Sequence, residues 1–343
     1  MMNEKILFYS AIAKVKLNSD DISIITDYIS KNNSIDFFIS IYRHKVQYLF
    51  FKHLLELKIA KKIDRNILNI LNTQFSFLQL KHKEWITVLK NVTERLEAEG
   101  IDYAILKGIG LSNELYTFNG LNYRDYNDID ILIEKKDVAQ VNEILEKLGF
   151  IQGDMNDNYE IEKSDRQQII YFSLNSHQEK SYIKFSKYSE FSPLNRLLID
   201  VNTTIFEGGK ISPKIDTKTL LSNTVSKKIN DFSYRKLSLE YNLIQLCYHF
   251  YKDTVYEIKK KRKESYCLMK FCDIREYILK YQHQLNWDNF INILNENNLS
   301  DEIYYVLNLI SSFYKDVDIE RVIKKLNFDE SCIEKADLSL LIQ

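Results

Sequence analysis

The stretch "RDYNDIDILI", residues 124 to 133, contains three aspartates and then continues into an apolar run. Alternate residues of a β-strand share a face, so Asp128 and Asp130 are predicted to point one way and the neighbouring isoleucines the other. Two carboxylates side by side on a largely buried strand repel each other and lose hydration, so they require a cation or a shared proton. The pattern therefore predicts a strand with one acidic, cation-binding face and one core face.

A second alternating stretch, "LLIDVNTTIF" at residues 197 to 206, offers a third carboxylate. It places Asp200 on one face of a strand and its apolar neighbours on the other. Hard cations such as Mg2+ prefer oxygen ligands and keep positions open for substrate phosphates, which is the arrangement of two-metal phosphoryl chemistry. We therefore expect Asp128, Asp130 and Asp200 to form one metal site. The alternative is a solvated edge strand with incidental acidic residues.

The segment "LKGIGLSNELY", residues 106 to 116, is a candidate phosphate site. A strand that ends in Lys-Gly and turns into a helix directs backbone N–H groups at an anion. Lys107 adds positive charge, Gly108 allows close approach of the backbone, and Arg124 is suited to bidentate pairing with a phosphate. The alternatives are an ordinary strand-to-helix turn and, for Arg124, an ion pair with Asp125 or another acidic residue.

The chain of 343 residues contains only 8 Gly and 2 Pro, which favours long helices joined by short polar turns. Apolar spacing predicts helices within residues 20–63 and 67–99 and from about residue 238 onward. Between them we expect a strand, helix, strand, helix order, with strands at 101–108 and 127–134 and a helix that begins at Asp137 and ends at Gly149. Further strands are expected at "QQIIYFSL" (167–174), "SYIKF" (181–185) and "LLIDVNTTIF".

These elements predict an α+β protein with a small mixed β-sheet core and helical units before and after it in the chain. The expected parts are an N-terminal helical unit (1–97), a mixed-sheet core (98–236) with a variable insert (151–193), and a C-terminal helical unit (237–343).

The overall composition excludes some functional classes. Lys and Arg number 47 against 48 Asp and Glu, so no global charge imbalance indicates a nucleic-acid coat or a membrane surface. The four cysteines lack a CxxC pair, which favours reduced thiols in a cytoplasmic protein over a disulfide framework or a zinc site. No apolar run approaches the ~20 residues of a membrane-spanning helix, and the N-terminal "ILFYSAIA" is interpreted as an amphipathic helix, not a signal segment.

The stretch "EGIDYAILKGIGLSNELYTFNGLNYRDYNDIDILIEKKDVAQVNEILEKLGF", residues 99 to 150, resembles the uncharacterised nucleotidyltransferase family of the DNA polymerase β superfamily. Family members have a Leu-Lys-Gly helix start, an Arg, an Asp-x-Asp strand and then a helix that ends in Gly-Phe. The resemblance extends more loosely to "IYRHKVQYLFFKHLLE", "IDVNTTI" and "LIQLCYHF", and so covers most of the chain except residues 151–193.

The resemblance implies attack of an acceptor hydroxyl on the α-phosphate of an NTP, with two Mg2+ ions and release of pyrophosphate. ATP is the expected donor, and AMP the group transferred. The implied roles are metal binding by Asp128 and Asp130, completion of the site near the nucleophile by Asp200, and phosphate binding by Lys107, Gly108 and Arg124. Family members often carry a histidine two residues after the third acidic position, where this chain has Asn202, so the role of that residue stays open.

Several other residues have both a structural and a functional interpretation. His249, at helical spacing in "LCYHFYKD", is expected to be a packed histidine more than a ligand, whereas Lys252 is a candidate contact for the base or a phosphate. The basic run "KKKRK" (259–263) is expected to be a solvated helix face, with a basic lip for triphosphate or nucleic acid as the alternative. Cys267 and Cys272 are expected to fill the core.

The nature of the acceptor divides the functional hypotheses. The first is a small molecule, peptide or protein. The second is RNA or tRNA, as in toxin-like relatives of the superfamily, although the near-neutral charge weakens it. The third is a catalytically silent scaffold that binds nucleotide or a partner through its helical units, and it gives no physical reason for three mutually repelling carboxylates. Residues 151–193, the least family-like part, are expected to contribute to acceptor choice.

Overall fold

The computed structural model describes residues 3–32, 34–191, 195–206, 215–255 and 266–326, together with residues 328, 338 and 341. The chain divides into two compact units. Unit 1 comprises Met1–Leu80, Ser112–Asp125 and Leu246–Gln343, and unit 2 comprises Lys81–Leu111 and Tyr126–Gln245. Helices from both ends of the chain thus belong to one unit. The three-part division with boundaries near residues 97 and 236 stays a prediction.

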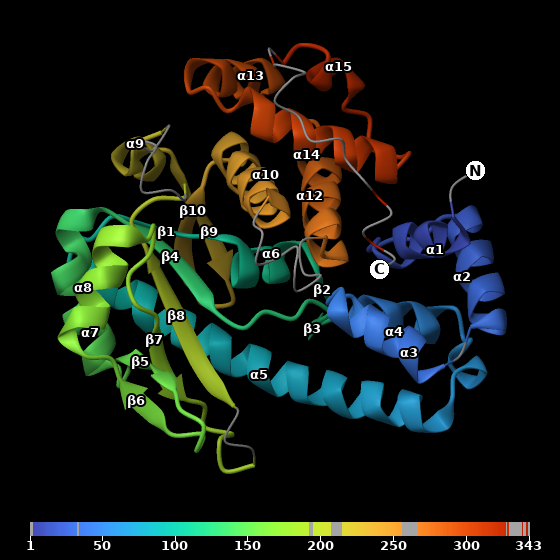
Figure 1. Ribbon diagram of the computed structural model, residues 1–343, viewed down its shortest axis with the longest axis horizontal. Coiled ribbons are helices and arrows are strands. Elements are labelled where there is room, and N and C mark those ends of the chain that lie inside the picture. Colours follow the sequence, from blue (N-terminus) through green and yellow to red (C-terminus); the bar gives the residue numbers. More distant parts are fainter. Residues whose placement is uncertain are drawn as a thin grey trace. The chain divides into compact units, whose positions relative to one another are not determined.

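Unit 1 is helical over most of its described residues (Figure 1). Its helices and its one short ribbon are α1 (Glu4–Ile12), α2 (Ser19–Lys31), α3 (Ile35–Arg43), α4 (Gln47–Glu56), η1 (Ala60–Lys62), α12 (Leu268–Tyr281), α13 (Trp287–Glu296), α14 (Ser300–Phe313), α15 (Glu320–Ile323), and β2 (Thr117–Phe118) with β3 (Leu121–Asn122). Aromatic rings fill part of its core, where Phe8 stacks on Tyr28 with ring centroids 4.3 Å apart. Three helices contain residues of both units: α5 (Arg65–Ala98), α6 (Lys107–Leu115) and α10 (Leu239–Val255).

Unit 2 is built on a six-stranded mixed sheet in the order β1-β4-β8-β7-β5-β6. The strands are β1 (Tyr103–Ile105), β4 (Ile129–Ile133), β5 (Ile151–Met155), β6 (Ile161–Lys163), β7 (Tyr182–Phe185) and β8 (Arg196–Asn202). The pair β4–β8 is parallel, and the other neighbouring pairs are antiparallel. The unit also contains η2 (Lys135–Asp137), α7 (Val138–Lys147), α8 (Arg166–Asn175), α9 (Thr217–Ser222) and the hairpin of β9 (Thr224–Ile229) with β10 (Phe232–Leu237).

One face of this sheet forms the hydrophobic core of unit 2. The second half of α5 supplies Trp85, Leu89, Val92 and Leu96, which are all fully buried. They belong to one core cluster with the apolar residues of β4 and β8, namely Ile129, Ile131, Ile133, Leu197, Ile199 and Val201. Because alternate residues of a strand point to opposite faces, the aspartates of the same strands lie on the other side of the sheet.

The predicted fold class is confirmed, and so is the strand, helix, strand, helix order of residues 101–149. Gly149 ends α7 with a φ of +84°, a conformation that favours glycine. Asp137 occupies the N-cap position of α7, but its side chain makes no capping hydrogen bond.

The prediction of a strand at residues 167–174 is wrong, because these residues belong to helix α8. A reciprocal capping box explains its start: the Asp165 side chain accepts a hydrogen bond from the Gln168 backbone N–H, and the Gln168 side chain accepts one from the Asp165 backbone N–H. The strand predicted at 181–185 is confirmed as β7. The β9–β10 hairpin was not predicted.

None of the helices formed by the described residues is both long enough and apolar enough to cross a membrane.

Candidate functional site

The register of β4 and β8 brings two of the predicted site residues together. These parallel neighbours pair Asp130 with Asp200, so both side chains lie on the sheet face opposite the core. Paired strands are about 4.8 Å apart, which places the two carboxyl groups within reach of one cation. Asp128 precedes β4 by one residue and is half-buried. The sequence predicted the shared face, and the structure adds the pairing of the two strands.

Asp130 is the most deeply buried of the three aspartates, with 3% of its surface exposed. Its Oδ1 lies 3.2 Å from Nζ of Lys107 and 3.5 Å from Nδ2 of Asn202. Its Oδ2 is buried and has no hydrogen-bond partner among the described residues. A buried carboxylate oxygen without a partner is costly, so this atom marks a place for a proton or a cation.

Burial raises the pKa of Asp130 to about 7, the nearby Asp128 and Asp200 add to the rise, and Lys107 opposes it. Burial also raises the pKa of Asp200, against a hydrogen bond from Ser181. Both pKa values rise for the same reason: the two carboxyl groups are buried, and the site contains more negative than positive charge.

Ser181 is a site residue that the sequence did not reveal. It lies next to β7, and its Oγ donates a hydrogen bond of 2.6 Å to Oδ1 of Asp200. A serine at the start of a strand carries no distinctive sequence signal. Only the antiparallel pairing of β7 with β8 places it beside Asp200.

Lys107 and Gly108 begin helix α6, as predicted. Gly108 has φ +42° and ψ −112°, a backbone conformation that a side chain disfavours. Lys107 turns toward the carboxylates. Burial alone would lower the pKa of Lys107, but Asp130, Asp128 and Asp200 together raise it above its ordinary value. In this structure the lysine is therefore a charged partner of Asp130, and phosphate binding by Lys107 and Gly108 stays a prediction.

Arg124 and Lys252 belong to unit 1. The Arg124 guanidinium is buried and pairs with Asp273 in bidentate fashion, through Nε to Oδ1 at 2.8 Å and Nη2 to Oδ2 at 2.7 Å. The hydroxyl of Tyr116 donates to the same Oδ1 at 2.8 Å. Lys252 is half-buried in α10. Nucleotide contacts by Arg124 and Lys252 stay predictions, and the Arg124 guanidinium already has an internal partner.

The other residues singled out in the sequence lie in β8, in α10, in the core or outside the described residues. Asn202 ends β8 and is buried beside Asp130, and His249 is half-buried in α10. Cys267 and Cys272 are buried free thiols, which confirms that they fill the core. The basic run 259–263 and one of the four cysteines, Cys332, lie outside the described residues.

The carboxylates are not already gathered as a ligand set. Among the residues that the structure describes, no group of three or more His, Cys, Asp or Glu side chains is arranged to hold a metal ion. Lys107 lies against one oxygen of Asp130. Joint ligation by Asp128, Asp130 and Asp200 therefore requires side-chain movement and stays a prediction.

The raised pKa of Asp130 predicts a pH effect on stability without metal. The carboxyl group of Asp130 holds its proton more tightly in the folded state than in the unfolded state. Its contribution to the free energy of unfolding is therefore favourable below pH 4 and is lost as the pH rises toward 7. Asparagine at position 130 does not titrate. In urea unfolding with EDTA, the free energy of unfolding of Asp130→Asn minus that of the wild type should increase from pH 5 to pH 8. A pH-independent difference would contradict this.

The fold and the site define an α+β protein whose mixed sheet carries two in-register aspartates on neighbouring parallel strands. A family model described as "Uncharacterised nucleotidyltransferase" matches residues 34–315, and the chain belongs to that family. The resemblance seen in residues 99–150 is thereby confirmed.

Among solved structures, the chain is similar to an antigenic nucleotidyltransferase-like protein from Paracoccidioides brasiliensis, known from a crystal structure. The sequence identity is 14%, the match covers 73% of this chain and 96% of that chain, and the TM-score is 0.37. No curated protein matches the chain.

Proposed function

We propose that this protein is a Mg2+-dependent nucleotidyltransferase that transfers AMP from ATP to a hydroxyl or similar group of a small-molecule, peptide or protein acceptor. The observation that carries the proposal is the Asp130–Asp200 pair on β4 and β8, together with the buried Oδ2 of Asp130, which has no hydrogen-bond partner in the part of the chain that the structure describes. A buried carboxylate of this kind is best explained by a cation that arrives with the substrate.

The residues suit magnesium by their chemistry. Three carboxyl groups, of Asp128, Asp130 and Asp200, act electrostatically on one lysine, so the site has more negative than positive charge and offers hard oxygen ligands. When bound, the metal ions lower the pKa of the acceptor hydroxyl and stabilise the leaving oxygens of the donor.

The chain's own residues would mainly bind and orient. Ser181 holds the Asp200 carboxylate in one orientation, beside the place proposed for the acceptor hydroxyl. Lys107 and the N-terminus of α6 would receive the donor phosphates. The acceptor oxygen bonds to the α-phosphorus, the bond from that phosphorus to the bridging oxygen breaks, pyrophosphate leaves, and the acceptor proton passes to Asp200 or water.

Isothermal titration of ATP, GTP, CTP and UTP with Mg2+ tests this function. The wild type is compared with an Asp128→Asn, Asp130→Asn double variant. Asp137→Asn is the matched control, since its side chain caps no backbone N–H. Metal-dependent binding of one NTP, lost in the double variant and kept in the control, supports the proposal. Absence of NTP binding in the wild type would favour a silent scaffold that binds a partner in place of a nucleotide.

Lys107→Gln should change two affinities in opposite directions. Without the lysine cation, the Asp130 carboxylate no longer has a competing positive partner. Mg2+ alone should therefore bind at least about 10-fold more tightly. Loss of the phosphate partner should weaken NTP binding by about 10-fold. Titration of Mg2+ and of the NTP in separate experiments measures both. A parallel loss of both affinities would show that Lys107 only maintains the fold.

A further inference from the structure

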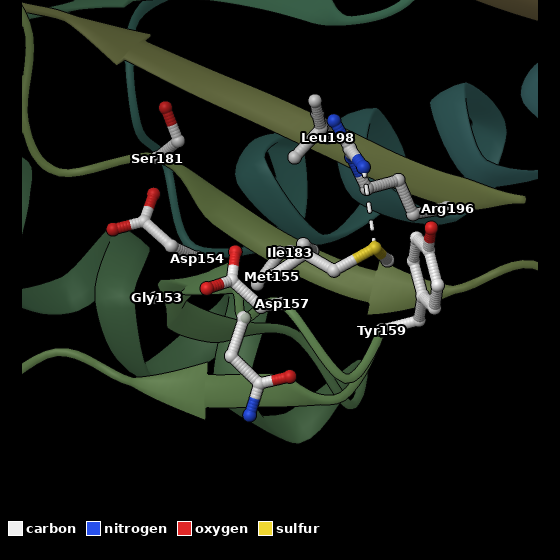
Figure 2. A pocket seen from close by; sticks show the side chains of 10 residues that line it. Gly153, Asp154, Met155, Asp157, Tyr159, Ser181, Ile183, Arg196 and Leu198 are labelled. Carbon is white, nitrogen blue, oxygen red and sulfur yellow. Dashed lines mark hydrogen bonds between the residues drawn. The ribbon is translucent and has the colours of Figure 1, made fainter. Parts of the chain in front are cut away.

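A cavity of about 430 Å³ opens on unit 2 beside strands β5, β7 and β8. The residues that define its character are Met155, Tyr159, Ser181, Ile183, Arg196 and Leu198. Figure 2 shows Ser181 at one end of this group and Arg196 with Tyr159 at the other. A cavity of this volume suits a small molecule. It lies almost entirely in the segment 151–193 and in the strand that carries Asp200.

The cavity lies next to the acidic pair. Leu198 lines it and is two residues from Asp200 on β8, so both side chains share a face. Ser181 also lines the cavity, and its Oγ contacts Oδ1 of Asp200 directly. A ligand in the cavity can therefore present a group to the Asp200 carboxylate.

The far end of the cavity carries a cation suited to an anion. Arg196 is half-buried, and the contact that the structure gives its guanidinium is with Sδ of Met155 at 3.4 Å, drawn as a dashed line in Figure 2. A thioether is a weak acceptor, and no carboxylate of the described residues pairs with this arginine. A buried or half-buried guanidinium usually binds a carboxylate or phosphate.

The acidic residues of the cavity leave this cation uncompensated. Asp154 is paired with Lys180 at 2.5 Å, so its charge is neutralised within the protein. Asp157 is exposed at the rim, where water screens its charge. Between the two ends, Ile183 and Leu198 face each other across the antiparallel β7–β8 pair and form an apolar floor.

The spacing of the two ends sets the size of the ligand. Asp200 and Arg196 are four residues apart on β8, and a strand rises about 3.3 Å per residue, so their Cα atoms are roughly 13 Å apart. We propose that this cavity binds the acceptor, and that the acceptor is an elongated small molecule with a hydroxyl at the Asp200 end and an anionic group at the Arg196 end. This inference rests on the proposed nucleotidyltransferase function and specifies its second substrate.

The test follows label from [α-32P]ATP, or the NTP selected by titration, into fractions of a cell extract in the presence of Mg2+. The extract is divided into a dialysable small-molecule fraction, an RNase-sensitive fraction and a protease-sensitive fraction. Each is incubated with the wild type, Arg196→Ala, Arg196→Lys and the control Arg166→Ala, which removes an exposed arginine of α8 outside the cavity. NTP binding is measured for each variant.

The expected label is in the dialysable fraction. Arg196→Ala should lower kcat/KM for that fraction by about 100-fold, mainly through KM, because a charge-assisted contact to the acceptor is lost. Arg196→Lys should recover part of the loss, and Arg166→Ala should match the wild type. All variants should bind NTP normally. If phosphatase treatment of the fraction abolishes labelling, the anionic group is a phosphate, and if labelling persists it is a carboxylate.

Two results would overturn the inference while the proposed function stands. One is labelling only of RNase- or protease-sensitive material, and the other is unchanged labelling of small molecules by Arg196→Ala. If the wild type transfers label to no fraction, the nucleotidyltransferase function itself fails, and the inference with it.

Discussion

Asp130→Asn is expected to lower nucleotide transfer by about 1000-fold or more, because the variant removes a buried charge that would hold metal against the developing transition state. The amide keeps the shape of the carboxyl group and one oxygen, so the sheet should be retained. Pyrophosphate release and label transfer measure the effect, and circular dichroism confirms the fold.

Asp137→Asn is the control for Asp130→Asn, since it makes the same chemical change at a helix start without a capping bond. The prediction depends on the charge and not on the volume of residue 130. If Asp130→Asn kept most of the activity, Asp130 would be a structural partner of Lys107 and the metal site would have to lie elsewhere.

Gly153→Ala is expected to destabilise the protein by about 3 kcal/mol or more, at the upper end of overpacking effects. A Cβ at position 153 would lie 2.1 Å from the backbone oxygen of Glu162 on the neighbouring strand β6. Backbone cannot rotate away as a flexible side chain can, so β5 and β6 would have to separate. Urea unfolding monitored by circular dichroism measures the loss.

Gly110→Ala serves as the matched glycine control. A Cβ there would meet Oη of Tyr234 at 3.7 Å, which is ordinary contact, and the residue lies in helix α6, where alanine is favoured over glycine. Gly110→Ala should therefore change stability little or raise it. Equal stability of the two variants would show that β6 adapts to a side chain at residue 153.

Local patterns in the sequence were sufficient for much of the fold. The alternation in β4 and β8 is a property of adjacent residues, so the acidic and apolar faces could be predicted without knowledge of the sheet. Residues 167–174 were misassigned because their mixed apolar pattern fits either a strand or a helix. The capping interaction of Asp165 with Gln168 decides for the helix.

Other features depend on long-range pairing. Ser181 lies beside Asp200 because β7 pairs with β8. The cavity forms because β7 also pairs with β5, which brings residues of the three strands together. Arg196 had no distinctive sequence context, because an arginine at the start of a strand is common on protein surfaces. Its proposed role depends on the cavity that residues of β5 and β7 form beside it.

The sequence by itself determined the family, the α+β class and the acidic strand face, because these follow from motifs and periodicities within short segments. Tertiary structure decided that Asp130 lies opposite Asp200 and that Arg124 pairs with Asp273. It also decided that Oδ2 of Asp130 is buried with no hydrogen-bond partner among the residues described. These contacts join residues far apart in the chain. They depend on strand register and on which surfaces pack together, and the free energies that select them come from the whole folded unit.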